Sequence, residues 1–277
     1  MSGKLYLVAT PIGNLEDITL RAIKILKEVD IVAAEDTRQT LKLLNHLNIN
    51  KTLISYHRHN EETKSKELIQ LLIEGKNIAL VSDAGTPVIS DPGEEVVKEA
   101  IKNNIQIIPI PGACALITAL ISSGLNSKEF LFLGFLPLNK KSRKEKLEEI
   151  KNTEKTIIIY EAPHKLKNTL QDLSETINKR QIVIARELTK IYEEFIKGTA
   201  EELINKIENP KGEFVLVIEG EQKENLITQT DLLNKLSIEE HYEYYLNQNL
   251  EKKEIIKKIA KDRGISKNEI YMKFLNK

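Results

Sequence analysis

Short runs of β-branched and other apolar residues alternate along the first 120 residues with segments in which apolar residues recur every three or four positions. The runs predict strands at residues 5–9, 31–34, 52–56, 78–81 and 105–110, and the spaced apolar positions predict helices between them. Strands that alternate with helices are typical of a largely parallel, doubly wound sheet. We therefore expect an α/β domain over residues 1–120.

A second set of apolar runs predicts another sheet. Its strands are expected at residues 130–136, 156–160, 182–185, 192–196 and 214–218, with helices at 142–150, 164–177 and 201–207. No helical pattern separates residues 182–185 from 192–196, which favours antiparallel pairing of these two strands. The sequence therefore predicts a mixed α/β domain over residues 121–224, beginning in a helix of small residues.

From residue 225 onward the pattern is helical. Residues 251–277 carry nine Lys or Arg against four Asp or Glu. A helix, a turn at Gly264 and a second helix with Ser266 as its N-cap fit a helix-turn-helix that meets nucleic acid. A solvated helical hairpin that packs on the preceding domain fits the composition equally well. The RNA-binding candidates in this segment are Lys257, Lys258, Lys261 and Lys267.

Composition limits the class of protein. The 277 residues include 41 basic and 41 acidic side chains, so any site for a polyanion must be local. The single cysteine, Cys114, excludes an internal disulfide and fits a reducing compartment. The chain enters its first strand without a signal-peptide pattern, and no apolar run is long enough to span a membrane. We expect a soluble cytoplasmic protein.

The loop after the strand at 78–81 carries the strongest chemical signal. Residues 82–93 read SDAGTPVISDPG, at the carboxyl end of a buried strand, where open α/β sheets bind ligands. Asp83 can accept hydrogen bonds from a ligand, and Gly85 lets the backbone come close to it. A tight turn in which Asp83 caps the next helix is the alternative interpretation.

Other strand ends supply weaker signals. Glu35 and Asp36 close the second strand, where a Rossmann protein would hold a ribose, but the first loop contains only one glycine and so lacks a pyrophosphate cradle. Residues 111–115 read PGACA and could meet a flat ligand or simply pack closely on the sheet. We interpret Cys114 as a small buried apolar side chain rather than a nucleophile.

Three polar segments have no metal-binding pattern and fit an RNA-facing rim instead. The alternating pair His57 and His59 would point to opposite faces of an extended chain, and no second Cys/His cluster accompanies it, so no metal site is expected. The RNA-binding candidates of this rim are Arg38, His57, Arg58, His59, Lys140, Lys141 and Arg143.

Six motifs, taken in order, resemble a known family. They are VATPIGNLED at 8–17, AEDTR at 34–38, the loop at 82–93, PGACA at 111–115, YEAPHKL at 160–166 and ARELTK at 185–190. Together they are similar to the signatures of the bacterial ribosomal RNA small subunit methyltransferase I family, within the tetrapyrrole methylase superfamily. The similarity runs from about residue 4 to residue 220. Lys165 departs from the arginine of many relatives, which weakens a phosphate contact there.

The resemblance implies a two-domain tetrapyrrole-methylase-like fold, with a parallel-rich sheet, a mixed sheet and a small all-helical C-terminal segment. It implies a homodimer that binds S-adenosylmethionine between the domains and methylates a cytidine ribose 2'-hydroxyl in the decoding region of 16S rRNA in the small ribosomal subunit. The implied cofactor-binding residues are Pro11, Asp83, Gly85, Thr86, Ala113, Cys114, Tyr160, Ala185 and Phe214. A hydroxyl that attacks the methyl group must lose its proton. Candidates for accepting it are Lys190, Glu187, Glu35 and Asp36.

Two other functions remain open at this point. A small-molecule methyltransferase of the same superfamily would act on a tetrapyrrole-like macrocycle. A regulator without catalytic activity would bind nucleic acid and sense a small ligand through the same fold.

Overall fold

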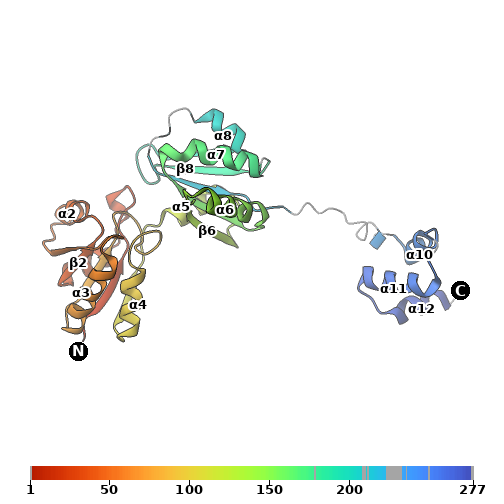
Figure 1. Cartoon of the computed structure of the whole chain (residues 1–277), viewed down its shortest axis with the longest axis horizontal. Coiled ribbons are helices and arrows are strands. Elements are labelled where there is room, and N and C mark those ends of the chain that lie inside the picture. Colours follow the sequence, from red (N-terminus) through yellow and green to blue (C-terminus); the bar gives the residue numbers. More distant parts are fainter. Residues whose placement is uncertain are drawn as a thin grey trace. The chain divides into compact units, whose positions relative to one another are not determined.

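The computed structural model describes residues 2–177, 179–207, 210, 212–222, 233–234, 236–248 and 250–275. The chain forms two compact units, Met1–Glu221 and Gln222–Lys277, and each is described by itself (Figure 1). The boundary expected near residue 120 lies inside the first unit, within helix α5 (Ala115–Ser123), and the division of this unit into two domains stays a prediction.

The first sheet is entirely parallel, as the alternating pattern predicted. Its strands lie in the order β3-β2-β4-β1-β5. Helices α3 and α4 cover one face and α1 and α2 the other, because each presents its apolar side chains to the sheet. The elements are β1 (Lys4–Val8), η1 (Leu15–Asp17), α1 (Leu20–Glu28), β2 (Ile31–Ala34), α2 (Thr37–His46), β3 (Thr52–Ser55), α3 (Glu61–Ile73), β4 (Ile78–Val81), α4 (Glu94–Lys102) and β5 (Gln106–Ile110).

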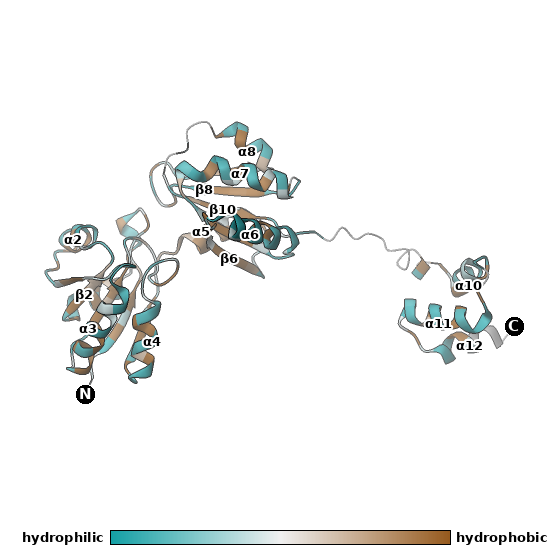
Figure 2. Cartoon of the chain, viewed as in Figure 1, coloured by the Kyte–Doolittle hydropathy of each residue, from teal (hydrophilic) through white to brown (hydrophobic). Residues whose placement is uncertain are grey.

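The second sheet is mixed and has the order β6-β7-β10-β8-β9. Strands β6 and β7 are parallel, whereas β10 is antiparallel to both β7 and β8. Helices α6, α7 and α8 cover one face, and α5 covers the other. In Figure 2 the strands are largely brown, while the outward faces of the covering helices are teal. The elements are β6 (Phe130–Phe135), α6 (Lys140–Asn152), β7 (Thr156–Glu161), α7 (Pro163–Ile177), β8 (Ile182–Arg186), β9 (Glu194–Gly198), α8 (Ala200–Lys206) and β10 (Phe214–Ile218).

Strands β8 and β9 pair antiparallel, as expected from the missing helix between them. The expected strand at 192–196 is displaced, however, because β9 begins only at Glu194. Tyr192 and Glu193 therefore lie in the connecting loop, next to Ile191, instead of the sheet. The β-branched and aromatic composition of residues 191–196 does not distinguish a strand from an exposed loop tip.

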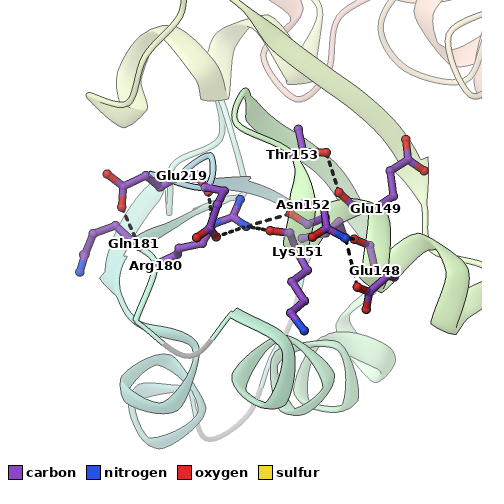
Figure 3. Close-up of polar contacts among 10 residues, drawn as sticks. Glu148, Glu149, Lys151, Asn152, Thr153, Arg180, Gln181 and Glu219 are labelled. Carbon is purple, nitrogen blue, oxygen red and sulfur yellow. Dashed lines mark hydrogen bonds and ion pairs between the residues drawn. The ribbon is translucent and has the colours of Figure 1, made fainter. Parts of the chain in front are cut away.

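A buried arginine ties together the end of the first unit. Arg180 is 8% exposed and lies in the turn between α7 and β8. Its Nε donates to the carbonyl oxygen of Glu219 at 2.5 Å, and its Nη1 donates to the carbonyl of Ile150 at 2.8 Å (Figure 3). These bonds join the last turn of α6 to the segment that follows β10, and Arg180 shares the Ile150 carbonyl with the backbone N–H of Thr153 at the C-cap of α6.

The second unit is helical, as the pattern after residue 224 predicted. It contains α10 (Ile238–Leu246), α11 (Lys252–Arg263) and α12 (Lys267–Leu275) around a small apolar core. Gly264 has a left-handed backbone between α11 and α12, and the hydroxyl of Ser266 accepts a hydrogen bond from the backbone of Glu269. Both turn signals in the sequence are thus confirmed. Among the described residues, no helix is long and apolar enough to cross a membrane.

Candidate functional site

A cleft with a cavity volume of about 150 Å³ lies in the first unit, at the carboxyl ends of β1 and β4 and next to the second sheet. Both sheets contribute to its walls. The lining residues are Ile12, Ala84, Gly85, Thr86, Ile89, Ser90, Asp91, Cys114, Ala115, Phe135, Tyr160, Glu213, Phe214 and Val215.

The loop that follows β4 forms one wall. Gly85 and Thr10 exchange two backbone hydrogen bonds, of 2.8 and 3.0 Å, and this bridge joins the loop to the end of β1. Gly85 has φ +86°, a conformation that favours glycine, and an added Cβ would lie 3.1 Å from Cγ2 of Ile12. Val88 and Ser90 also have positive φ, so the loop stores backbone strain beside the cleft.

Contacts from the segment at 56–61 hold this strained loop in place. The guanidinium of Arg58 donates to the carbonyl oxygen of Ser90. The carboxylate of Glu61 accepts the backbone N–H of Gly93 at 2.8 Å, at the start of α4. Arg58 is one of the expected RNA-binding residues; it is exposed, and its Nη2 is bonded to the cleft loop, so its contact with RNA stays a prediction.

Glu35 and Asp91 lie near Arg58, and Asp83 lies near both of these carboxyl groups. Burial, helped by the charges of Asp91 and Asp83, raises the pKa of Glu35. Burial likewise raises the pKa of Asp91, although the charge of Arg58 opposes the shift. Asp83 accepts the backbone N–H of Asp36 at 2.9 Å and so joins β4 to the end of β2. Of these carboxyl groups, only Asp91 lines the cleft.

Aromatic side chains form the wall contributed by the second sheet. The hydroxyl of Tyr160 accepts the backbone N–H of Leu116 at 3.2 Å, and burial raises the pKa of Tyr160 to about 12. The rings of Phe132 and Phe135 pack edge-on against it at 5.0 and 5.7 Å. The rings of Tyr160, Phe135 and Phe214 line the cleft and give it an apolar surface suited to a flat ring, with Phe132 packed behind Tyr160.

A charged cluster borders the cleft at Glu213. Lys190 Nζ lies 3.0 Å from a carboxylate oxygen of Glu187 and 3.6 Å from one of Glu213. Burial alone would lower the pKa of Lys190, but the hydrogen bond to Glu187 and the charge of Glu213 raise it overall. Lys190 is therefore a cation at neutral pH and cannot accept a proton.

The structure brings five of the nine expected cofactor-binding residues into the cleft wall: Gly85, Thr86, Cys114, Tyr160 and Phe214. Ala113 lies directly behind it, since its carbonyl accepts the Thr86 hydroxyl at 3.1 Å. Ala185 is fully buried in β8, and Pro11 and Asp83 are not among the lining residues.

None of the four expected proton acceptors lines the cleft. Asp36 is ion-paired with Arg38, whose hydrogen bond lowers the pKa of Asp36 to about 2. Sequence reasoning missed Asp91 and Glu213. Asp91 stands inside the loop at 82–93, and Glu213 directly precedes a strand. The available signal was therefore the presence of a charged residue at the end of an apolar strand.

The expected RNA-binding residues fall into two groups. Arg143 is mostly enclosed and bonds to Asp172 at 2.6 Å and to Thr169 at 2.8 Å, which gives it an evident structural role. His57 is half-buried, with its backbone N–H bound to Asn60. The others are exposed, namely Arg38, Arg58, His59, Lys140, Lys141, Lys257, Lys258, Lys261 and Lys267. No cluster of potential metal ligands occurs in the described part of the chain.

Comparisons with known proteins agree with this geometry. Residues 4–204 match the model of the tetrapyrrole (corrin/porphyrin) methylases. The chain is 55% identical to ribosomal RNA small subunit methyltransferase I of Halalkalibacterium halodurans and 50% identical to that of Bacillus subtilis; each alignment covers 97% of this chain and 93% of the relative.

Solved structures are similar in fold at low sequence identity. Diphthine synthase has a TM-score of 0.64 and 16% identity, over 78% of this chain and 90% of that one. Uroporphyrin-III C-methyl transferase from Thermus thermophilus, complexed with S-adenyl homocysteine, has a TM-score of 0.56 and 17% identity, over 78% and 97%.

Proposed function

Because the chain belongs to the tetrapyrrole methylases, and within them to the ribosomal RNA small subunit methyltransferase I family, we propose a specific reaction for it. The chain is an S-adenosylmethionine-dependent methyltransferase that acts on ribosomal RNA. We propose that the acceptor is the ribose 2'-hydroxyl of a cytidine in the decoding region of 16S rRNA. The small ribosomal subunit in the bacterial cytoplasm would then be its partner.

The cleft at the ends of β1 and β4 is the observation that carries the proposal. Its aromatic wall of Tyr160, Phe135 and Phe214 suits a flat adenine, and Gly85 leaves room for close backbone approach. The carboxylate of Asp91 supplies negative charge for a cationic sulfonium. The residues present therefore fit S-adenosylmethionine, which supplies an electrophilic methyl group when bound.

The chain's own residues would act mainly by positioning the reactants and placing charge. As the ribose oxygen forms its bond to the methyl carbon, the carbon–sulfur bond breaks and the hydroxyl proton must leave. Asp91 lies in the cleft wall and its raised pKa suits proton uptake. We propose Asp91 as the acceptor in place of Lys190, Glu187, Glu35 and Asp36.

Exposed lysines would position the polyanion. Lys257, Lys258 and Lys261 are exposed on α11, and Lys267 begins α12. Contacts from these side chains to phosphates would add salt-dependent affinity that does not depend on sequence. This supports RNA binding by the helical unit.

A homodimer is also part of the proposal. Ile117 and Ile121 on α5 and Phe130 on β6 expose apolar surface that a second copy would cover. Light scattering on the wild type and on Ile121→Lys tests this, and a monomeric wild type would contradict it.

The reaction is tested by transfer of a labelled methyl group from S-adenosylmethionine. The acceptors compared are small subunits from a strain without the gene, naked 16S rRNA, DNA, free cytidine and a uroporphyrinogen-like macrocycle. Nuclease digestion and mass spectrometry should yield one 2'-O-methylcytidine from the subunits or the rRNA. A methyl group on a base, or efficient labelling of the macrocycle, would contradict the proposal.

A further inference from the structure

The loop between β8 and β9 exposes two large side chains. Ile191 is 94% exposed and Tyr192 is 80% exposed, which makes Tyr192 the most exposed aromatic residue in the part of the chain that the structure describes. Transfer of an aromatic ring from water into a packed contact is strongly favourable. A ring left in solvent on a well-defined loop thus calls for a partner.

The loop is held rigidly in this conformation. Glu187 has φ +50° and Thr189 has φ +66°, both unusual for residues other than glycine. The carboxylate of Glu193 accepts the backbone N–H of Thr189 at 2.6 Å, and backbone bonds join Lys190 to Glu187 and Glu193 to Lys190. Backbone strain persists only where surrounding contacts compensate for it. The loop therefore displays Ile191 and Tyr192 in a preorganised position.

The base of the loop is attached to two segments of the cleft wall. Glu187 and Glu213 are joined by two hydrogen bonds of 3.2 Å each, and Glu213 lines the cleft. On the other side, the hydroxyl of Thr189 accepts the backbone N–H of Asn14 at 3.1 Å, two residues after the lining residue Ile12. The loop thus stands at the border of the site where the methyl acceptor must enter.

We propose that Tyr192 is a stacking platform for an unpaired base of the ribosomal RNA beside the methylated nucleotide. This inference rests on the proposed function. Proteins that read RNA hold splayed bases against exposed aromatic rings, because every base has a flat face to offer. A ribose that reaches into the cleft brings its own base and its neighbours to this border.

Three substitutions separate the ring from other features of the side chain. Tyr192→Ala should lower kcat/KM for small subunits by about 5- to 150-fold, the range expected for one lost base stack. Tyr192→Phe keeps the ring and should stay within about twofold of wild type, taking twofold as the precision of the assay. Affinity for S-adenosylmethionine, measured by calorimetry, should not change in either variant. Ile101→Ala removes an exposed apolar side chain near the far end of α4 and is the matched control.

Fluorescence gives a direct measure of stacking, since the chain contains no tryptophan. Tyr192→Trp should retain activity, and its fluorescence should be quenched when a 16S rRNA fragment binds. Ile101→Trp provides the control and should not be quenched.

The outcomes separate this inference from the proposed function. If wild type methylates small subunits but Tyr192→Ala is equally active, or the fluorescence of Tyr192→Trp is not quenched, the stacking role is wrong while the reaction stands. Equal losses in Tyr192→Phe and Tyr192→Ala would also overturn it, since the hydroxyl would then be the important group. A change in molar mass of Tyr192→Ala would instead assign the loop to contact between two copies. Failure of the wild type itself to methylate ribosomal RNA would refute the proposed function.

Discussion

Replacing Gly85 by alanine tests whether the cleft is the cofactor site. At φ +86° an L-residue is strained by about 1–2 kcal/mol. For a folded unit of this size, that loss lowers Tm by roughly 2–8 °C. The new Cβ would lie 3.1 Å from Cγ2 of Ile12, so the cleft wall must move by a few tenths of an ångström. If the movement weakens the two-bond bridge to Thr10 by about 1 kcal/mol, affinity for S-adenosylmethionine falls roughly 5-fold.

Gly124→Ala is the matched control. Gly124 has a similar φ of +76°, at the end of α5 away from the cleft, and an added Cβ would meet only the flexible end of Lys197 at 3.5 Å. Both variants should lose similar stability in a thermal melt, but only Gly85→Ala should lose affinity in calorimetric titration with S-adenosylmethionine. Equal affinity in the two variants would refute the reasoning and place the cofactor elsewhere.

Three further predictions concern the cleft loop and the helical unit. Burial raises the pKa of Asp91 above 3.8, so the folded state binds the Asp91 proton more tightly than the unfolded state. The free energy of unfolding therefore falls as pH rises from 3.8 through the folded-state pKa. Asp91→Asn should raise Tm at pH 7.5, and thermal melts should show this gain vanish below about pH 3.8. Arg58→Met removes the hydrogen bond to Ser90, and calorimetry should show roughly 3- to 10-fold weaker cofactor binding. Unchanged affinity would mean that the cleft loop holds its shape without Arg58. Removal of residues 222–277 should leave cofactor affinity intact, but it should weaken rRNA binding and reduce the salt dependence of that binding. An unchanged salt dependence in filter binding would argue that this unit does not contact RNA.

Local patterns predicted most elements of the fold. An apolar run such as residues 78–81 indicates a buried strand because all of its consecutive side chains lie away from water. The glycine at 264 and the serine at 266 indicate a turn because of the backbone conformations that they favour. The displaced start of β9 shows the limit of this reasoning. Residues 191–193 have strand-like composition, but two positive φ angles and the bond from Thr189 to Glu193 hold the preceding loop outside the sheet.

The sequence by itself also determined where one wall of the cleft lies, because the loop at 82–93 follows a buried strand and strand ends bind ligands in this class of sheet. Only the tertiary structure decided what faces that wall. Phe135, Tyr160 and Glu213 come from distant parts of the chain, and the strand orders of the two sheets bring them to Asp91. Arg58 likewise bonds to Ser90, 32 residues away. Periodicity reports which side chains are buried, whereas the partners they meet depend on how strands pair and layers pack, which no local pattern records.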